Sequence, residues 1–178
     1  MKFDIKNPAF MQAACGKKNE SIMTLFSSSE EYLYFNLTVR GTGILSYKDK
    51  EGVDDYVMLH DGVNSLSIKT LPLPSGKIVI NANVVSFEAN DESVAEFLNE
   101  LDISNCKSLN SFNLGEPKFS SLVSLTMKAD KEALSQQMAY LVENTNGVGC
   151  TLQLVNNQPY NKLMEDAAAV QEWQVEYI

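Results

Sequence analysis

Carboxylate side chains are the chemically most suggestive residues of this sequence, and they occur in pairs at residues 30–31, 49–51, 54–55 and 91–92. Paired carboxylates carry out acid–base chemistry in glycoside hydrolases and bind calcium in other proteins. None of the pairs has the Asp-x-Asp-x-Asp-Gly spacing of a calcium loop. Because a chain with a formal net charge of −9 needs exposed acidic loops in any case, we interpret the pairs as solvated surface.

Other nucleophiles and metal ligands are few. His60 is the only histidine, so a histidine-based metal cluster is excluded, and the residues around it, 59–62, indicate a turn. The three cysteines, Cys15, Cys106 and Cys150, are odd in number and widely separated, and they form no Cys-x-x-Cys motif. We therefore expect free, buried thiols rather than disulfides or a metal site.

Short motifs of catalysis and nucleotide binding are also weak here. The glycines at 41–43 and 146–149 lack the following lysine, or the strand-to-helix spacing, of a phosphate-binding loop, and no serine lies in a Gly-x-Ser-x-Gly motif. The spacing of Tyr32, Tyr34 and Phe35 fits a strand with one buried and one exposed face. We favour core packing as the role of these aromatic side chains, and an aromatic surface that binds a sugar is the alternative. We expect no catalytic residue, no cofactor, no metal and no enzyme activity.

Composition limits the class of partner. The chain has 178 residues, 44% of them hydrophobic, which is enough for one domain or two small ones with a real core. Arg40 is the only arginine, and 14 basic residues face 23 acidic ones, so neither nucleic acid nor an anionic membrane is an expected partner. Residues 1–18 lack the basic start and long apolar run of a secretory signal, and no stretch is long enough to span a bilayer.

The first third of the chain indicates strands that follow one short helix. Residues 8–16 suit a helix that Asn7 caps, and residues 21–26, 32–39, 43–48, 55–59 and 65–71 are rich in β-branched and aromatic residues. Glycine-containing segments at 40–43 and 60–62 lie where hairpin loops would fall. This pattern predicts a small antiparallel β-sandwich, and the prolines and glycine of residues 71–76 place the boundary of an N-terminal domain, 1–72.

Apolar residues after this boundary follow a different pattern. Triplets with the spacing L-x-x-L-x-L recur, and the middle residues of alternate triplets lie 24 or 25 positions apart, within the range of leucine-rich repeats. Since one such coil cannot bury its apolar side alone, neighbouring coils must stack. The alternative is ordinary strands with chance spacing. The predicted repeat core consists of Leu98, Leu101, Ile103, Cys106, Leu109, Phe112, Leu114, Leu122 and Leu125.

The last third alternates helix and strand. Residues 130–147 have an amphipathic helical pattern with Asp130 as cap and Gly147 as exit, and residues 159–173 form a second such helix that Pro159 opens. Residues 150–155 and 173–178 indicate strands. We interpret this segment as the end-cap of a short repeat domain, 73–178. The predicted fold is α+β and mainly β: a small antiparallel β-sandwich, then a short leucine-rich-repeat-like unit with a C-terminal helix and strand cap.

The residues 32–52, 65–91, 98–115 and 167–178 together resemble the short leucine-rich-repeat proteins of gut bacteria and their phages, the BspA-like group. Members place a small β-sandwich before the repeats and close with a helix followed by a Gly-Trp-x-Val strand. This chain has Glu172 in place of that glycine, and Tyr-Lys-Asp-Lys-Glu-Gly at 47–52 where members often carry Trp-Gly-Asp-Gly. The resemblance implies an interaction scaffold rather than an enzyme.

Two functions follow from these expectations. The first is a non-enzymatic structural protein, present in many copies as an auxiliary, decorating or tail-associated component of a phage or phage-like particle, with particle subunits or further copies of itself as partners. Its expected location is the virion, or otherwise the bacterial cytoplasm. The alternative is an adhesin-like module that binds host glycan or protein through the exposed strand face of its repeats.

Overall fold

The computed structural model describes residues 21–27, 32–49, 51–69, 76–115 and 120–178. Within them the fold is mainly β with three helices, which confirms the predicted α+β, mainly β class. The predicted helix at 8–16 and most of the predicted boundary lie outside the described residues. The strands are β1 (Ile22–Ser27), β2 (Tyr32–Lys48), β3 (Asp54–Leu59), β4 (Gly62–Lys69), β5 (Lys77–Ala89), β6 (Leu98–Asp102), β7 (Ser111–Asn113), β8 (Ser124–Met127), β9 (Thr151–Leu154) and β10 (Gln174–Tyr177), and the helices are α2 (Ser93–Phe97), α3 (Glu132–Glu143) and α4 (Asn161–Val170).

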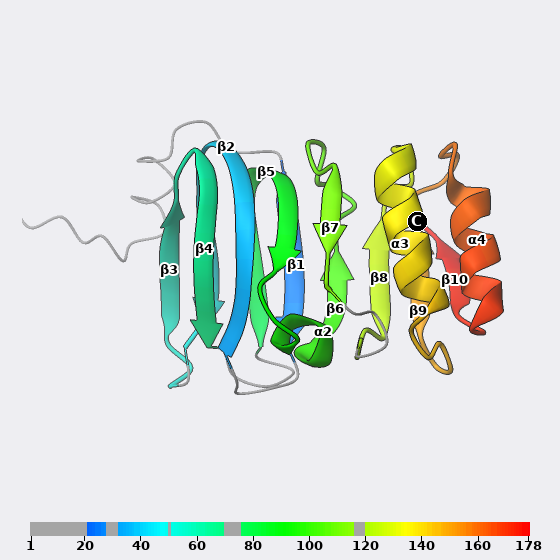
Figure 1. Cartoon of the computed structure of the whole chain (residues 1–178), viewed down its shortest axis with the longest axis horizontal. Helices are drawn as coiled ribbons and strands as arrows, with labels where there is room; N and C mark the ends of the chain where they lie inside the picture. Colours follow the sequence, from blue (N-terminus) through cyan, green and yellow to red (C-terminus); the bar gives the residue numbers. More distant parts are fainter. Residues whose placement is uncertain (1–20, 28–31, 50, 70–75, 116–119) are drawn as a thin grey trace, which may run out of the picture.

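All described strands belong to one mixed sheet. Its main path runs β10-β9-β8-β6-β1-β5-β2-β3, while β4 pairs with β2 and β7 pairs with β5. Pairing among β1 to β5, and between β1 and β6, is antiparallel, whereas β6, β8, β9 and β10 are parallel neighbours. Figure 1 shows β4, β7, α3 and α4 on the side facing the viewer, with β4 beside β2 and with α3 and α4 in front of the parallel strands at the C-terminal end. We call that side the front layer and the strands behind it the back layer.

The bend in β2 corrects a prediction. Residues 40–43 are not a hairpin turn, because β2 continues through them as one strand of 17 residues. In the pairing with β5, Arg40 is opposite Asn83 and the next pair is Ile44 with Asn81, so extra residues bulge from β2. The β2 residues before this bulge pair with β4, and those after it pair with β3. The two halves of β2 therefore contribute to different layers (Figure 1).

Glycine makes the bend compact. A Cβ at Gly43 would lie 2.3 Å from the Cβ of Ala82 on the neighbouring strand, so no other residue fits there without displacement. The turn at residues 60–62 is present, but it is not a hairpin either, because β3 and β4 each pair with β2. Gly62 has a φ of 93°, which glycine adopts readily.

The core contains two ladders of apolar side chains. Leu101 of β6, Leu125 of β8 and Leu152 of β9 are register partners along the back layer, and all three are buried. In the front layer Phe87 of β5 pairs in parallel with Phe112 of β7, and their rings stack at a centroid distance of 4.5 Å. The 24- and 25-residue spacings of the sequence are therefore spacings between paired residues of neighbouring parallel strands.

Strand pairing crosses the predicted domain boundary, because β5 and β6 of the predicted second domain both pair with strands of the predicted first domain. Strand β5, from the predicted second domain, lies between β1 and β2 of the predicted first domain. The buried side chains of both predicted domains form one contiguous cluster. A division at residue 72 into units that fold independently stays a prediction.

The C-terminal helices and strands lie where the sequence pattern predicts them. The cap of α3 differs, because Lys131 occupies the N-cap position without a side-chain capping bond, and Asp130 pairs instead with Lys128 at 2.8 Å. Gly147 lies beyond the end of α3 against Trp173, where a Cβ would come within 2.1 Å of the indole ring. The short helix α2 was not predicted.

Candidate functional site

The nine predicted repeat-core residues are all buried, with exposed fractions of 6% or less. They come from α2–β6, the turn after β6, β7 and the segment leading into β8. Their side chains belong to the hydrophobic core, and two of them, Phe112 and Leu114, also line a cavity, which is described below. Their assignment as leucine-rich-repeat positions stays a prediction.

Both described cysteines are free and buried. The Cys106 thiol donates to the carbonyl oxygen of Ile22 at 3.3 Å, so it joins the turn after β6 to the start of β1. Burial raises the pKa of Cys106 to about 12, and the nearby charge of Asp102 raises it further. Burial also raises the pKa of Cys150. Because the thiolate is the reactive form, neither thiol is set up as a nucleophile at neutral pH.

The acidic loop at residues 49–55 has a structural explanation. The Asp49 carboxylate accepts hydrogen bonds from the backbone N–H groups of Glu51 and Val53, which closes the turn between β2 and β3. Asp54 pairs with Lys48 at 2.8 Å, and both side chains are well exposed. No group of three or more His, Cys, Asp and Glu residues in the described segments of the chain is arranged to hold a metal ion.

Tyr47 is the titratable neighbour of this loop. Its hydroxyl donates to Asp55 at 3.0 Å. Partial burial, the hydrogen bond to Asp55 and the charge of that carboxylate raise the pKa of Tyr47 to about 12. A phenol with a raised pKa stays protonated and serves as a hydrogen-bond donor, so the pair stabilises the loop rather than activating a base.

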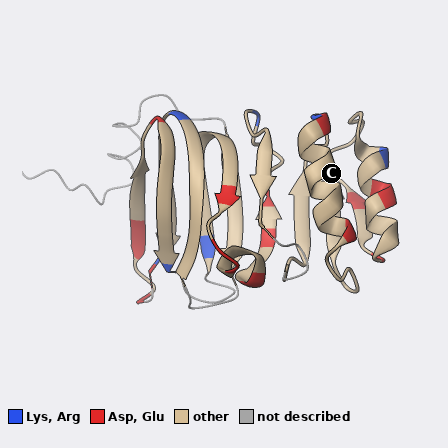
Figure 2. Ribbon diagram, viewed as in Figure 1, with Lys and Arg blue, Asp and Glu red and all other residues tan. Residues whose placement is uncertain are grey.

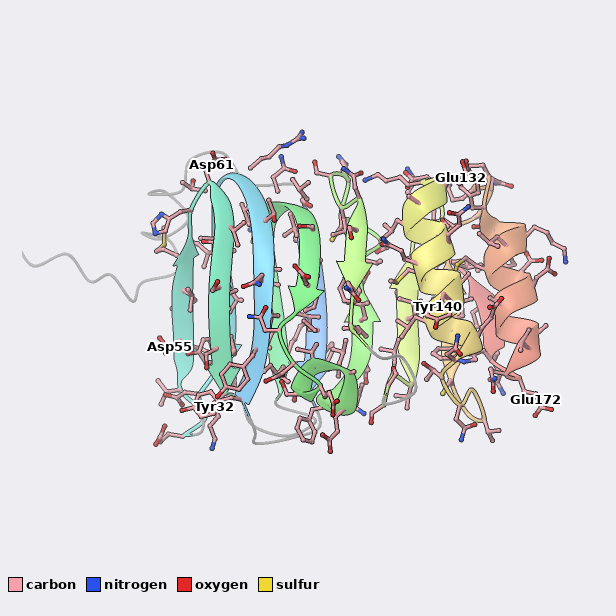
Figure 3. All side chains as sticks on the ribbon, in the orientation of Figure 1. Tyr32, Asp55, Asp61, Glu132, Tyr140 and Glu172 are labelled. Carbon is pink, nitrogen blue, oxygen red and sulfur yellow. The ribbon has the colours of Figure 1, made fainter. Side chains whose placement is uncertain are left out.

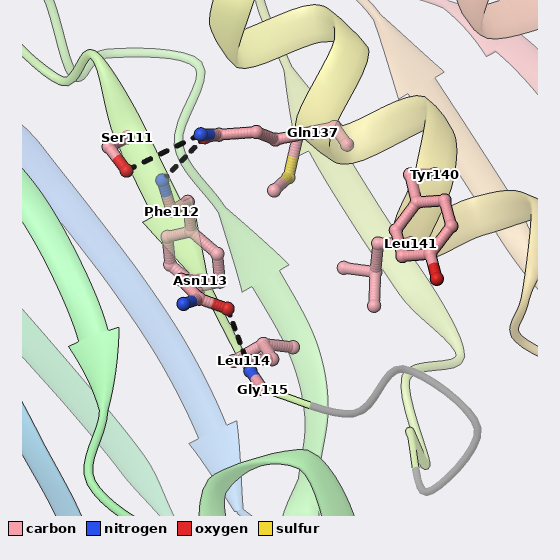
Figure 4. Close-up of a pocket in the computed structure, with 9 residues that line it drawn as sticks. Ser111, Phe112, Asn113, Leu114, Gly115, Gln137, Tyr140 and Leu141 are labelled. Atoms are coloured by element: carbon pink, nitrogen blue, oxygen red, sulfur yellow. Dashed lines mark hydrogen bonds between the residues drawn. The ribbon is translucent and has the colours of Figure 1, made fainter.

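A cavity lies between β7 and α3 in the front layer (Figure 4). Its volume is about 200 Å³. Figure 4 shows the strand residues 111–115 on one side, Tyr140 and Leu141 on the other, and Gln137 reaching across from the helix to the strand. The lining residues are Ser111, Phe112, Asn113, Leu114, Gly115, Gln137, Met138, Tyr140 and Leu141.

Gln137 determines the shape of this cavity. Its Oε1 accepts a hydrogen bond from the backbone N–H of Phe112 at 3.0 Å, and its Nε2 lies 3.5 Å from the Ser111 hydroxyl. Among the described strands, β7 pairs only with β5, and Gln137 covers some of the opposite edge, where a further strand would otherwise bind. The Asn113 side chain accepts from the N–H of Gly115 at 2.9 Å and turns the chain away after β7.

A polar row of side chains leads across the front layer to the cavity. The row consists of successive register partners and runs from Ser65 on β4 through Asn36 on β2 and Glu88 on β5 to Asn113 on β7. The Asn36 amide donates to Asn90 at 2.6 Å. In Figure 2 the front layer between β4 and α3 carries few charged residues, among them Glu88 on β5, and other acidic residues lie on β3, near α2, on β6 and on the C-terminal helices. The front row is therefore mainly neutral and polar.

Exposed tyrosines flank this row. Tyr32 and Tyr34 lie on the outer face of β2, with exposed fractions of 44% and 40%, and Tyr140 projects from α3 with 59% of its surface exposed (Figure 3). The core interpretation of the aromatic run thus holds for Phe35, which is fully buried, and not for the two tyrosines. No sequence signal selected Gln137 or Tyr140, although both lie beside the apolar stripe of α3.

The outer face of the back layer differs between its two regions. On the parallel strands it is polar: Asp102, Thr126, Gln153 and Glu176 are successive register partners, and hydrogen bonds of 3.0 Å join the last three side chains. On the antiparallel strands it is more apolar, with Ile22 exposed on β1.

Comparisons with protein-family models, with curated proteins and with solved structures found no match. Among the described residues, no helix is long and apolar enough to cross a membrane.

Proposed function

We propose that this chain is a non-enzymatic interaction protein, a component present in many copies of a phage or phage-like particle. The resemblance of residues 32–178 to the BspA-like group supports this assignment, and so does an apolar patch on the outer face of the back layer. A face of this kind suits a protein partner, such as a particle subunit or a second copy of the chain.

The apolar patch is the observation that carries the proposal. It follows one row of register partners, which runs from Met58 on β3 through Ile44 on β2 and Asn81 on β5 to Ile22 on β1. Met58 and Ile22 are each 38% exposed. Neighbouring strands lie roughly 5 Å apart, so these side chains are adjacent on one surface. Asn81 is the one polar residue of this row, half-buried Val79 adds apolar surface beside it on β5, and exposed apolar surface marks interaction sites.

We also propose the finer description of the fold. The antiparallel strands form a small sandwich-like unit, because β2 and β5 pass through both layers. The remainder is a short leucine-rich-repeat-like unit, supported by the parallel pairing of Leu101 with Leu125 and by the helices that alternate with β8, β9 and β10. An interaction scaffold made of two such units needs no catalytic group.

Quantitative mass spectrometry of density-purified particles from the source culture tests the particle assignment. We expect a stoichiometric signal in particles for the natural chain and a strong reduction for Met58→Lys, because the lysine places a charge in the apolar contact. Val63→Lys is the matched control: Val63 is 69% exposed on β4, in the other layer, and its substitution should leave incorporation unchanged. Absence of the natural chain from particles contradicts the proposal.

The second candidate function is an adhesin-like module that binds a glycan or a host protein. The polar rows on the outer face of the parallel strands favour it, because hydroxyl and amide groups held in register offer many donors and acceptors. Saturable binding of the purified chain to a glycan array or to host cells, weakened by Gln153→Ala, would support this function over the structural one.

A further inference from the structure

We propose that the cavity between β7 and α3 is a binding site for a single neutral sugar ring. The inference rests on the glycan-binding candidate function above, and it assigns the ligand to the front layer instead of the outer face of the parallel strands. Three features of the cavity carry it: a backbone acceptor without a partner among the described residues, a side-chain donor beside it, and an exposed tyrosine over an apolar floor.

The backbone acceptor is the carbonyl of Phe112. The N–H of Phe112 donates to Gln137 on α3, so this residue turns its backbone polar groups away from β5 and toward the cavity. The N–H and the carbonyl of one strand residue point to the same side. In the described segments of the chain, no donor is bonded to this carbonyl, and an acceptor at a half-covered strand edge is available to a ligand.

The donor is the side-chain amide of Gln137. Its Nε2 carries two protons and, within the part of the chain that the structure describes, makes one long contact, 3.5 Å to the hydroxyl of Ser111. One proton therefore remains for a ligand, next to the Phe112 carbonyl. Two neighbouring hydroxyl groups of a pyranose ring match this arrangement, since one donates to the carbonyl while the other accepts from the amide.

Tyr140 provides the apolar contact. Its ring stands at the rim of the cavity with 59% of its surface exposed, opposite the strand (Figure 4). The floor comes from Leu114, Met138 and Leu141, each 5% exposed or less. A sugar ring has one face of C–H groups and a polar rim, so its C–H face packs against the electron-rich face of the tyrosine while the rim reaches the strand edge.

Size and charge narrow the ligand class. A cavity of about 200 Å³ is smaller than the pockets of drug-sized ligands and holds one ring. Glu88 is the register partner of Asn113 beside the cavity, and the chain carries a formal charge of −9. Both disfavour a carboxylate on the ligand, so the site selects neutral hexoses or their N-acetyl derivatives over uronic or sialic acids.

The test is an NMR titration of the ¹⁵N-labelled full chain with single sugars: glucose, galactose, mannose, N-acetylglucosamine, N-acetylgalactosamine and glucuronic acid. We expect at least one neutral sugar to cause saturable shifts in the backbone amides of Phe112, Leu114 and Gly115 and in the side-chain amide of Gln137. Glucuronic acid should bind about tenfold more weakly than its neutral counterpart, glucose.

Two tyrosine variants locate the site. Tyr140→Ala should weaken sugar binding about tenfold or more, because it removes the ring that the sugar packs against. Tyr177→Ala is the matched control, since Tyr177 is 46% exposed on β10 in the back layer and its substitution should leave the affinity unchanged. Both positions are exposed, so the spectra of the variants should show the native fold.

Several outcomes would overturn the inference. One is a titration in which no sugar shifts the cavity amides, and another is a short leucine-containing peptide that shifts them where sugars do not. Glycan-array binding that Gln153→Ala abolishes and Tyr140→Ala leaves intact would keep the adhesin-like function and eliminate this site. The absence of any glycan binding would eliminate both.

Discussion

The two regions of the molecule cover the hydrophobic core in different ways. The antiparallel region contains β1 to β5, and the parallel region contains β6 to β10 with α3 and α4. In the antiparallel region the long strands β2 and β5 cross from one layer to the other, so a single strand supplies both sides of the core. In the parallel region β6, β8, β9 and β10 stay in the back layer, and β7, α3 and α4 lie in front of them (Figure 1).

This difference extends to the surfaces. The outer face of the back layer carries apolar side chains such as Ile22 and Met58 where the strands are antiparallel, and polar ones such as Thr126 and Gln153 where they are parallel. We therefore propose the antiparallel part of this face for a protein partner and the parallel part for polar ligands. The two regions nevertheless share one core, and the stacked rings of Phe35, Phe87 and Phe112 lie where they meet.

The largest expected effect is at this junction. Phe87→Ala removes a fully buried ring that stacks on Phe35 at 4.9 Å and on Phe112 at 4.5 Å, and should lower the free energy of unfolding by about 4 kcal/mol. Chemical denaturation followed by circular dichroism and by tryptophan fluorescence measures it. Since the core is continuous, both signals should shift together.

Tyr34→Ala, on the exposed face of β2, is the control and should change stability by about 0.5 kcal/mol or less. If the fluorescence of Trp173, in the parallel region, kept its midpoint while the circular dichroism transition split, the two regions would be separate folding units. That result would support the predicted division of the chain into two domains at residue 72.

A smaller effect tests the parallel region alone. Gly147→Ala places a Cβ 2.1 Å from the Trp173 ring and 2.2 Å from the Gln171 carbonyl oxygen, and should cost about 3 kcal/mol of stability. Gly149→Ala is the matched control: no heavy atom lies within 4 Å of its Cβ position, and only its φ of 80° is unfavourable, at about 1 kcal/mol. If thermal denaturation showed the same loss of stability for both variants, the Trp173 side chain would move aside for the new Cβ without an energetic cost.

The smallest effect concerns alkaline pH. The pKa of Cys106 is about 12 in the folded chain against an ordinary value of 9.0, so the folded state holds its proton more tightly. The stabilisation is complete below about pH 9 and is lost as pH rises toward 12, on the order of 2 kcal/mol by about pH 10.5. Cys106→Ala should therefore lose less stability than the natural chain over this range, in denaturant titrations at several pH values.

Tyr47 provides the counterpart in the antiparallel region. Its pKa is also raised, to about 12, chiefly by partial burial and by its bond to Asp55. The sign is the same, because its protonated form is the one that the fold favours. Tyr47→Phe should reduce the loss of folding stability at alkaline pH by less than Cys106→Ala does, because Tyr47 is more exposed to solvent than Cys106. A larger change from Tyr47→Phe would reverse the comparison.

The parallel region could be predicted well from the sequence because its signals are local. The helical stripe of α3 and the apolar alternation of β9 each lie within a short window, and the 24-residue spacing of Leu101 and Leu125 reappears as a register pair. The antiparallel region could not be predicted as fully. Gly41 has a φ of 78°, which suits a hairpin turn and a bend equally, so the local pattern at residues 40–43 does not distinguish them.

The candidate site was beyond sequence reasoning for a related reason. The cavity depends on the unpaired edge of β7 and on Gln137, which is 25 positions from Phe112 in the chain and bonded to it in the fold. Nothing near Gln137 or Tyr140 distinguishes them from ordinary exposed helix residues. The position of β5 between β1 and β2 is likewise a long-range pairing, and the strand patterns alone do not specify it.

The long strands β2 and β5 also determine how the molecule would respond to mechanical force. Strand β10 pairs only with β9 among the described strands, and β9 in turn joins β10 to β8. A load applied at the carboxyl end would therefore peel off β10 with α4, then β9 with α3, in a series of small steps. Strands β2 and β5 run through both layers side by side, so they would resist until many hydrogen bonds sheared together.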